Sequence, residues 1–167
     1  QLKPDFPDAL INLGNALKEK GDLNSAILSF QKALQIKPDF EQAHYNLGNA
    51  LQEKGDLNSA INSYQNAIKF NPDYQNAHNN LGTALQEKGD LNSAINSYQN
   101  AIKLNPDYQE AYNNLGTALK EKGDLDSAIN SYKNAIKLNP KYQEAHNNLG
   151  NAFKEQGDLN SAIDSYQ

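Results

Sequence analysis

Apolar residues recur along the chain in stripes with helical spacing. Between positions 109 and 124 one stripe consists of Ala111, Leu115, Ala118 and Leu119. Between positions 125 and 138 a second consists of Leu125, Ala128, Ile129, Tyr132, Ala135 and Ile136. Residues three or four apart lie on one side of an α-helix, so each stripe predicts an amphipathic helix with one apolar face.

The residues between the stripes predict where these helices begin and end. Gly123 follows the first stripe and is expected to take the left-handed conformation that closes a helix. Asp124 precedes the second stripe and is expected to cap it. Pro140 pushes Asn139 out of the helical region, which ends the second helix. The segment therefore predicts a helix, a tight turn and an antiparallel helix.

The linker before the first helix carries its own start signal. Asp107 and Glu110 have the spacing of a capping box. Asp39 and Asp73 occupy equivalent places and are expected to cap in the same way, whereas Lys141 cannot.

The pattern returns every 34 residues, which is most visible at the prolines Pro4, Pro38, Pro72, Pro106 and Pro140. A fixed period of this size predicts a solenoid of stacked helix pairs. Complete repeats run from 7 to 40, 41 to 74, 75 to 108 and 109 to 142, with a partial fifth at 143–167 and the tail of a preceding repeat at 1–6. Because the first residue is Gln and neither end has a polar cap, we expect a longer parent protein or end-to-end stacking of copies.

Each repeat also carries a Leu-Gly pair, then an Ala with an aromatic residue four positions later, then a Pro. In the third repeat these are Leu81-Gly82, Ala94, Tyr98 and Pro106. This pattern resembles the tetratricopeptide repeat (TPR) family. The family's usual Trp is replaced here by Leu10, His44, His78, Tyr112 and His146. The resemblance implies an all-α, right-handed superhelical solenoid that binds a protein or peptide partner in a concave groove lined by the first helices.

Composition excludes several other classes. The net charge is -5, and all 15 cations are Lys, so nucleic-acid binding is not expected. Cysteine is absent, which excludes disulfides and thiolate sites. The mean hydropathy is -0.82 and no apolar run is long enough to predict membrane insertion. We expect a cytoplasmic protein.

No catalytic, metal or cofactor site is predicted. Equivalent residues recur in every repeat, whereas an active site is one unrepeated constellation. The histidines His44, His78 and His146 stand one per repeat. Packed helices lie about 8–10 Å apart, too far for neighbouring copies to share an ion at about 2 Å. These histidines are expected to pack between helices.

The two residues that directly precede each Leu-Gly pair are the candidate ligand contacts. The second is asparagine in all five copies: Asn12, Asn46, Asn80, Asn114 and Asn148. An asparagine inside a helix costs up to roughly 0.7 kcal/mol relative to alanine. A side-chain amide can pair with both the N–H and the C=O of an extended peptide, which favours a ladder facing a ligand. The alternatives are hydrogen bonding to the adjacent repeat, or a chain that is simply rich in Asn.

The first position varies between Ile11, Tyr45, Asn79, Asn113 and Asn147 and is interpreted as a specificity position. Asn49, Thr83 and Thr117, together with Tyr45, are expected to sense the side chains of the ligand. The glycine of each Leu-Gly pair is expected to allow close approach of the paired helix. The aromatic series Phe30, Tyr64, Tyr98, Tyr132 and Tyr166 is expected in the core.

Three functions therefore stay open. The first is a non-catalytic scaffold that holds an extended peptide. The second is the substrate-recruiting arm of a larger glycosyltransferase-like enzyme, because the Asn-rich groove resembles the TPR arm of O-linked N-acetylglucosamine transferases. The third is a structural oligomer that self-associates through uncapped ends.

Overall fold

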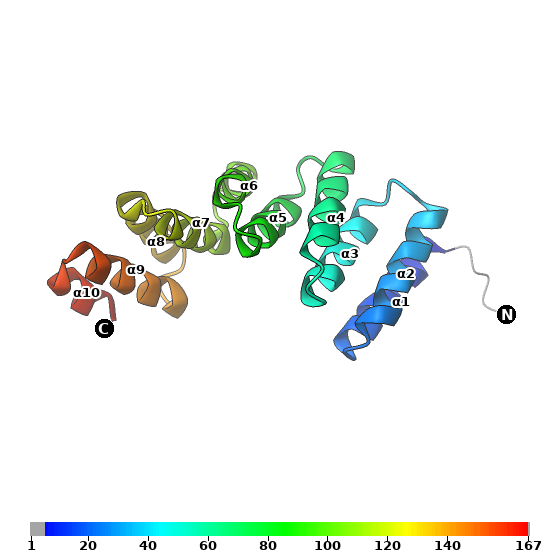
Figure 1. The fold of residues 1–167 in the computed structure, drawn as a ribbon, viewed down its shortest axis with the longest axis horizontal. Coiled ribbons are helices and arrows are strands. Elements are labelled where there is room, and N and C mark those ends of the chain that lie inside the picture. Colours follow the sequence, from blue (N-terminus) through cyan, green and yellow to red (C-terminus); the bar gives the residue numbers. More distant parts are fainter. Residues whose placement is uncertain (1–5, 167) are drawn as a thin grey trace. The chain divides into compact units, whose positions relative to one another are not determined.

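The computed structural model describes residues 6–166, and Figure 1 shows them as successive helices joined by short turns. These residues form no strand, and the helices are α1 (Pro7–Glu19), α2 (Leu23–Ile36), α3 (Glu41–Glu53), α4 (Leu57–Phe70), α5 (Gln75–Glu87), α6 (Leu91–Leu104), α7 (Gln109–Glu121), α8 (Leu125–Leu138), α9 (Gln143–Gln156) and α10 (Leu159–Tyr166). The odd-numbered helices are the first helices of the repeats and the even-numbered ones the second. The prediction of an all-α fold is confirmed.

The chain divides into two compact parts, Gln1–Ala84 and Leu85–Gln167. Helices α1 to α4 and most of α5 belong to the N-terminal part, and α6 to α10 to the C-terminal part. In each part a second helix packs on the first helix of the next repeat, as α2 does on α3 and α8 on α9. The predicted tail at 1–6 lies, except for Phe6, outside the described residues, as does Gln167.

The turn inside each repeat has the predicted chemistry. The five glycines of this turn have φ between 84° and 91°. Each is followed by an aspartate whose carboxylate accepts the backbone N–H three residues later, as Asp124 accepts from Ser127 at 3.1 Å. Both predictions, the left-handed glycine and the aspartate cap, are confirmed. These two residues turn the chain back so that the two apolar faces meet.

The predicted capping box at the start of the first helices is wrong. Helix α7 begins after Tyr108, and α3 begins after Phe40, and neither of these N-cap residues caps with its side chain. Asp107 stands one residue too early to cap. Its backbone N–H donates instead to the Asn105 side chain at 3.1 Å. Such a bond closes an Asx turn, so the Asn-Pro-Asp linker is held by its asparagine.

Four glycines of the Leu-Gly pairs, Gly14, Gly48, Gly116 and Gly150, face the aromatic ring of the second helix. A Cβ built on Gly48 would lie 2.6 Å from Tyr64 Cε1, and one on Gly116 would lie 2.6 Å from Tyr132 Cε1. Both tyrosines are fully buried. The prediction of a close approach is confirmed at these glycines. The predicted core position is confirmed at Phe30, Tyr64, Tyr98 and Tyr132, whereas Tyr166 of the last helix is 48% exposed.

Candidate ligand-binding face

The outer side of the first helices carries the candidate ligand residues, and we call it the first-helix face. It comprises the second asparagine of each repeat and the residue three positions later: Asn12, Asn15, Asn46, Asn49, Asn80, Thr83, Asn114, Thr117, Asn148 and Asn151. Each compact part contains its own stretch of this face. The side chains here are joined by hydrogen bonds that run from one repeat to the next.

In the N-terminal part a chain of bonds runs through Asn46. The Tyr74 hydroxyl donates to Gln42 Oε1 at 3.1 Å, and Gln42 Nε2 donates to Asn46 Oδ1 at 3.1 Å. Asn46 Nδ2 then donates to Asn15 Oδ1 of the preceding repeat at 3.1 Å. Asn46 is only 7% exposed. This asparagine therefore links two neighbouring first helices from beneath the surface.

Asn80 makes the equivalent link one repeat further on. Its Nδ2 donates to Asn49 Oδ1 at 2.9 Å and to the Tyr45 hydroxyl at 3.2 Å, and its Oδ1 accepts from Asn79 Nδ2 at 3.3 Å. A primary amide has two N–H groups and two acceptor lone pairs, so Asn80 uses both donors and one lone pair inside the protein. Its side chain is half-buried and held in a fixed orientation.

The C-terminal part repeats the arrangement at α7 and α9. Asn148 Nδ2 donates to Asn113 Oδ1 at 3.0 Å, and Asn113 Nδ2 donates to Glu144 Oε1 at 3.1 Å. Asn113 is 1% exposed. Asn114 and Thr117 are half-buried on the same side of α7. Hydrogen bonding between neighbouring repeats, one of the alternatives for the second asparagine, is thus present at Asn46, Asn80 and Asn148.

The predicted specificity position, which holds Ile11, Tyr45, Asn79, Asn113 and Asn147, lies deeper than a ligand contact requires. Asn79 is 7% exposed and Asn113 1%, so both lie beneath the surface. Of the five residues at this position, only Asn147 is exposed. The interpretation of this position as ligand-facing does not match the burial of Asn79 and Asn113. Side chains there fill the seam between adjacent first helices, as the aromatic ring of Tyr45 does.

Tyr45 belongs to an aromatic cluster in the N-terminal part. Its ring centroid lies 4.9 Å from that of Tyr74 and 6.1 Å from that of Tyr64. Burial, and next the neighbouring Tyr45, raise the pKa of Tyr74 to about 12. Tyr74 therefore keeps the hydrogen that it donates to Gln42 even at a pH where an ordinary tyrosine begins to ionise.

Tyrosines of the second helices also reach this face with their hydroxyl groups, a feature that sequence reasoning missed. The Tyr64 hydroxyl lies 2.8 Å from both Asn49 Oδ1 and Gln52 Oε1, and its single hydrogen serves one of them at a time. Tyr132 donates to Thr117 Oγ1 at 3.3 Å and Tyr166 to Asn151 Oδ1 at 2.8 Å. A buried tyrosine needs a hydroxyl partner, and the constant Asn or Thr after each Leu-Gly pair was the available signal.

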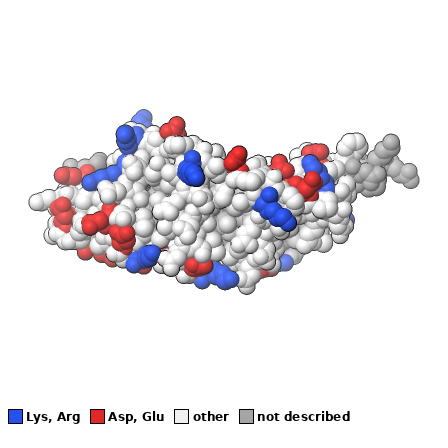
Figure 2. Space-filling model, turned by 90° about the horizontal axis from the view of Figure 1, so that it is seen from above, with Lys and Arg blue, Asp and Glu red and all other residues white. Residues whose placement is uncertain are grey.

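Charge contributes little to the first-helix face. Lys18 Nζ and Glu53 Oε2 lie 3.5 Å apart on partly exposed side chains, a pair of small energetic value. Figure 2 shows one face of the molecule with acidic and lysine side chains interspersed among other residues. Asn12 is exposed, and Asn80, Asn114 and Asn148 are half-buried. The accessible groups of the first-helix face are therefore mainly uncharged amides and hydroxyls.

The histidines tie each linker to its first helix. The Nε2 atom of His44 lies 2.9 Å from the Pro38 carbonyl oxygen, and the equivalent distance for His78 and Pro72 is 3.0 Å. A carbonyl oxygen only accepts, so Nε2 carries the proton. The His44 ring stacks on Phe70 with centroids 5.5 Å apart, which confirms the predicted packing role for His44. The described residues contain no group of His, Asp and Glu that could hold a metal ion.

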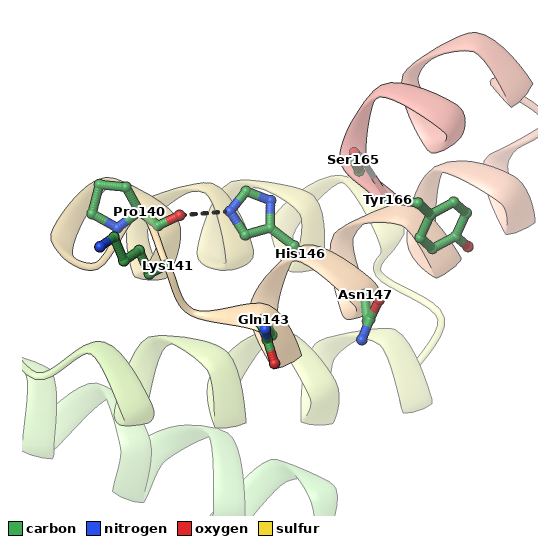
Figure 3. A pocket seen from close by; sticks show the side chains of 7 residues that line it. All are labelled: Pro140, Lys141, Gln143, His146, Asn147, Ser165 and Tyr166. Atoms are coloured by element: carbon green, nitrogen blue, oxygen red, sulfur yellow. Dashed lines mark hydrogen bonds between the residues drawn. The ribbon is translucent and has the colours of Figure 1, made fainter.

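A pocket lies beside the third of these histidines, between α9 and α10 (Figure 3). Its lining residues are Pro140, Lys141, Gln143, His146, Asn147, Ser165 and Tyr166. His146 Nε2 lies 3.0 Å from the Pro140 oxygen, as the dashed line shows. In repeat 2 the ring of Phe70, near the end of α4, occupies the equivalent place against His44. The pocket thus marks the place that the end of a longer second helix fills elsewhere.

A comparison with protein families identifies the repeats. The family model described as TPR repeat matches residues 14–55, 49–89, 83–123 and 116–157. The chain belongs to the tetratricopeptide repeat family, whose members bind protein partners and are typically non-catalytic scaffolds. None of the curated proteins matches the chain significantly.

Solved structures with the same fold include other TPR proteins. MamA is 29% identical with a TM-score of 0.86, over 92% of this chain and 90% of its own. YrrB, described as a TPR protein with an unusual peptide-binding site, is 23% identical with a TM-score of 0.80, over 98% of this chain and 84% of its own. PilF of Pseudomonas aeruginosa is 22% identical with a TM-score of 0.87, over 96% of this chain and 73% of its own. The last two likenesses concern the fold alone. Among the described residues no helix is long and apolar enough to cross a bilayer.

Proposed function

We propose that this TPR chain is a scaffold that holds an extended peptide segment against the first-helix face of one of its compact parts. The observation that carries the proposal is the row of uncharged amides on this face, fixed in orientation by bonds between repeats. Asn80 is the example with the most bonds, to Tyr45, Asn49 and Asn79. Groups held in place before binding lose little freedom when a ligand arrives.

The amides keep capacity for a ligand. After its three bonds Asn80 has one lone pair left to accept from a peptide N–H. Asn148 donates to Asn113, and its Oδ1 accepts from no described residue. Asn12 is exposed. Such groups recognise peptide backbone and demand no particular side chain from the partner.

The side chains of the peptide would meet Asn49, Thr83, Thr117 and Tyr45. Asn79 and Asn113 would act beneath them by fixing Asn80 and Asn148. The alternative of a substrate-recruiting arm uses the same face and stays a prediction.

The test begins with peptides selected from a displayed library of unstructured 15-residue sequences, whose binding is then measured by calorimetry. The variant Asn12→Ala/Asn80→Ala/Asn148→Ala is expected to bind about 10- to 100-fold more weakly, since each lost hydrogen bond is worth about 0.5–1.5 kcal/mol. The matched control is Asn62→Ala/Asn96→Ala/Asn130→Ala, which changes three exposed asparagines of the second helices. Circular dichroism checks that both variants fold. Selection of no peptide, or equal losses in both variants, would contradict the proposal.

A further inference from the structure

The first and last described helices expose apolar residues whose equivalents are buried inside the array. Leu13 of α1 is 50% exposed, whereas the same position is 8% exposed at Leu47 and 7% at Leu149. Ile163 of α10 is 54% exposed, whereas Ile27 is 8% and Ile129 6% exposed. The two positions are complementary, because inside the chain the isoleucine of one repeat and the leucine of the next share one apolar cluster.

The junction between repeats 1 and 2 shows how such faces fit together. Its apolar centre joins Ala26, Ile27 and Phe30 of α2 to Ala43, Leu47 and Ala50 of α3. Three polar pairs surround this centre. They are Asn46 to Asn15 at 3.1 Å, Lys54 to Asn24 at 2.8 Å, and Lys18 to Glu53 at 3.5 Å.

The two ends of the array carry the same residue types at the corresponding positions. Asn46 and Asn15 correspond to Asn12 and Asn151, and Lys54 and Asn24 correspond to Lys20 and Asn160. Lys18 and Glu53 correspond to Lys154 and Glu19. The apolar contact of Ile27 with Leu47 corresponds to Ile163 with Leu13.

This agreement is not shared by every junction. Between repeats 4 and 5 the pair equivalent to Lys54 and Asn24 is Gln156 and Asp126, 2.7 Å apart. Between repeats 3 and 4 the Lys–Glu pair is replaced by Gln86 and Glu121, 2.8 Å apart. The end faces therefore match the chemistry of one particular internal junction.

We propose that a second copy of this chain covers these faces, so that α10 of one copy packs on α1 of the next as α2 packs on α3. The α10 side offers Ile163 together with Tyr166, which is 48% exposed, whereas its equivalent Tyr132 is fully buried. The contact is heterologous, since the two partners use different faces. Each pair keeps one unused face at either end, and association continues into longer head-to-tail assemblies.

The test measures mass against concentration by sedimentation equilibrium. The chain of 18.5 kDa is expected to rise in average mass to twice this value and beyond as concentration increases. Leu13→Glu and Ile163→Glu each place a charge in the contact and are expected to weaken association more than about tenfold, so that each alone stays largely monomeric at the lowest concentrations where the unmodified chain associates. Both side chains are half exposed in the single chain, and circular dichroism checks that the variants fold.

Mixing the two variants gives the decisive result. Leu13→Glu keeps an intact α10 face and Ile163→Glu an intact α1 face, so an equimolar mixture is expected to form dimers that cannot grow. The matched control is Leu28→Glu, a change at a 57% exposed residue of α2 whose equivalents are Asn62, Asn96, Asn130 and Asp164; it should associate like the unmodified chain. A monomeric unmodified chain, variants that associate normally, or a mixture without dimers would each overturn the proposal.

Discussion

At the scale of single residues, the absence of a side chain at one helix position makes room for a tyrosine ring of the neighbouring helix. Gly48 has no Cβ, and the Tyr64 ring occupies the space where one would lie. Glycine inside a helix costs about 1 kcal/mol relative to alanine, so helix propensity alone argues for replacing it. The buried ring cannot swing away, because Tyr64 is fully enclosed and its hydroxyl bonds to the first-helix face. Packing therefore decides the residue at this position.

We expect Gly48→Ala to lower the free energy of unfolding by about 1–3 kcal/mol, the usual cost of overpacking a core. Urea denaturation followed by circular dichroism measures the change. A second variant, Gly48→Ala/Tyr64→Leu, removes the ring and should reduce the penalty of the alanine. If the alanine stabilised the chain while Tyr64 was present, the close approach would not be the reason for the glycine.

Asn80 is the second test at this scale. Asn80→Ala should lower the free energy of unfolding by about 1–3 kcal/mol, because it leaves Asn49 and the Tyr45 hydroxyl without the amide that joins them. Asn96→Ala, on the exposed side of α6, should have little effect or slightly stabilise the chain through helix propensity. Urea denaturation compares the two. Equal effects would show that the bonds between repeats add nothing.

At the scale of elements, each second helix begins with the same cap. The hydroxyl of the serine three residues later, and then its backbone N–H, hold the pKa of the capping carboxyl below its usual 3.8; the five caps are Asp22, Asp56, Asp90, Asp124 and Asp158. A carboxyl whose pKa is lower in the folded state adds stability above pH 3.8. That contribution is lost as the pH falls through the lower folded pKa.

We expect the urea midpoint to fall as the pH drops below about 4, partly through these five caps. Asparagine also caps helices but does not titrate. Replacing all five aspartates by asparagine should therefore preserve the midpoint at pH 7 approximately and make its fall between pH 4 and pH 2 smaller. An identical fall in both proteins would mean that the caps do not contribute to acid sensitivity.

The second helices could be predicted from the sequence with their boundaries, because Gly123 and Asp124 act on adjacent backbone groups. The start of the first helices could not. Asp107 is a residue type that often caps helices, but the helix begins one residue later, after Tyr108. The Asn105 side chain holds the linker instead. The stripe containing Tyr64 predicted burial correctly, yet a pattern shows the side of a helix and not how far a hydroxyl reaches.

The same limit applies to the candidate ligand residues. Sequence reasoning placed the second asparagine on the outer side of the first helices and named bonding between repeats as an alternative. It could not tell that Asn113 would be 1% exposed while Asn147 is exposed, because burial depends on whether a following repeat covers the residue.

At the scale of the whole molecule, stability is the sum of repeats and of the contacts between neighbours. The terminal helices lack one neighbour, as the exposure of Leu13 and Ile163 shows. At concentrations where the chain is monomeric, we expect backbone amides of α1 and α10 to exchange hydrogen faster than those of α3 and α8. Mass spectrometry of deuterated fragments measures this. Uniform exchange over all helices would contradict a nearest-neighbour description.

The central claim is that the first-helix face is where this scaffold meets its partner. The most direct measurement is a nuclear magnetic resonance titration of the ¹⁵N-labelled chain with a selected peptide, which follows the side-chain NH₂ signals. The largest shifts are expected at Asn12, Asn80 and Asn148. Shifts confined to the exposed asparagines of the second helices, such as Asn62 and Asn96, would contradict the claim.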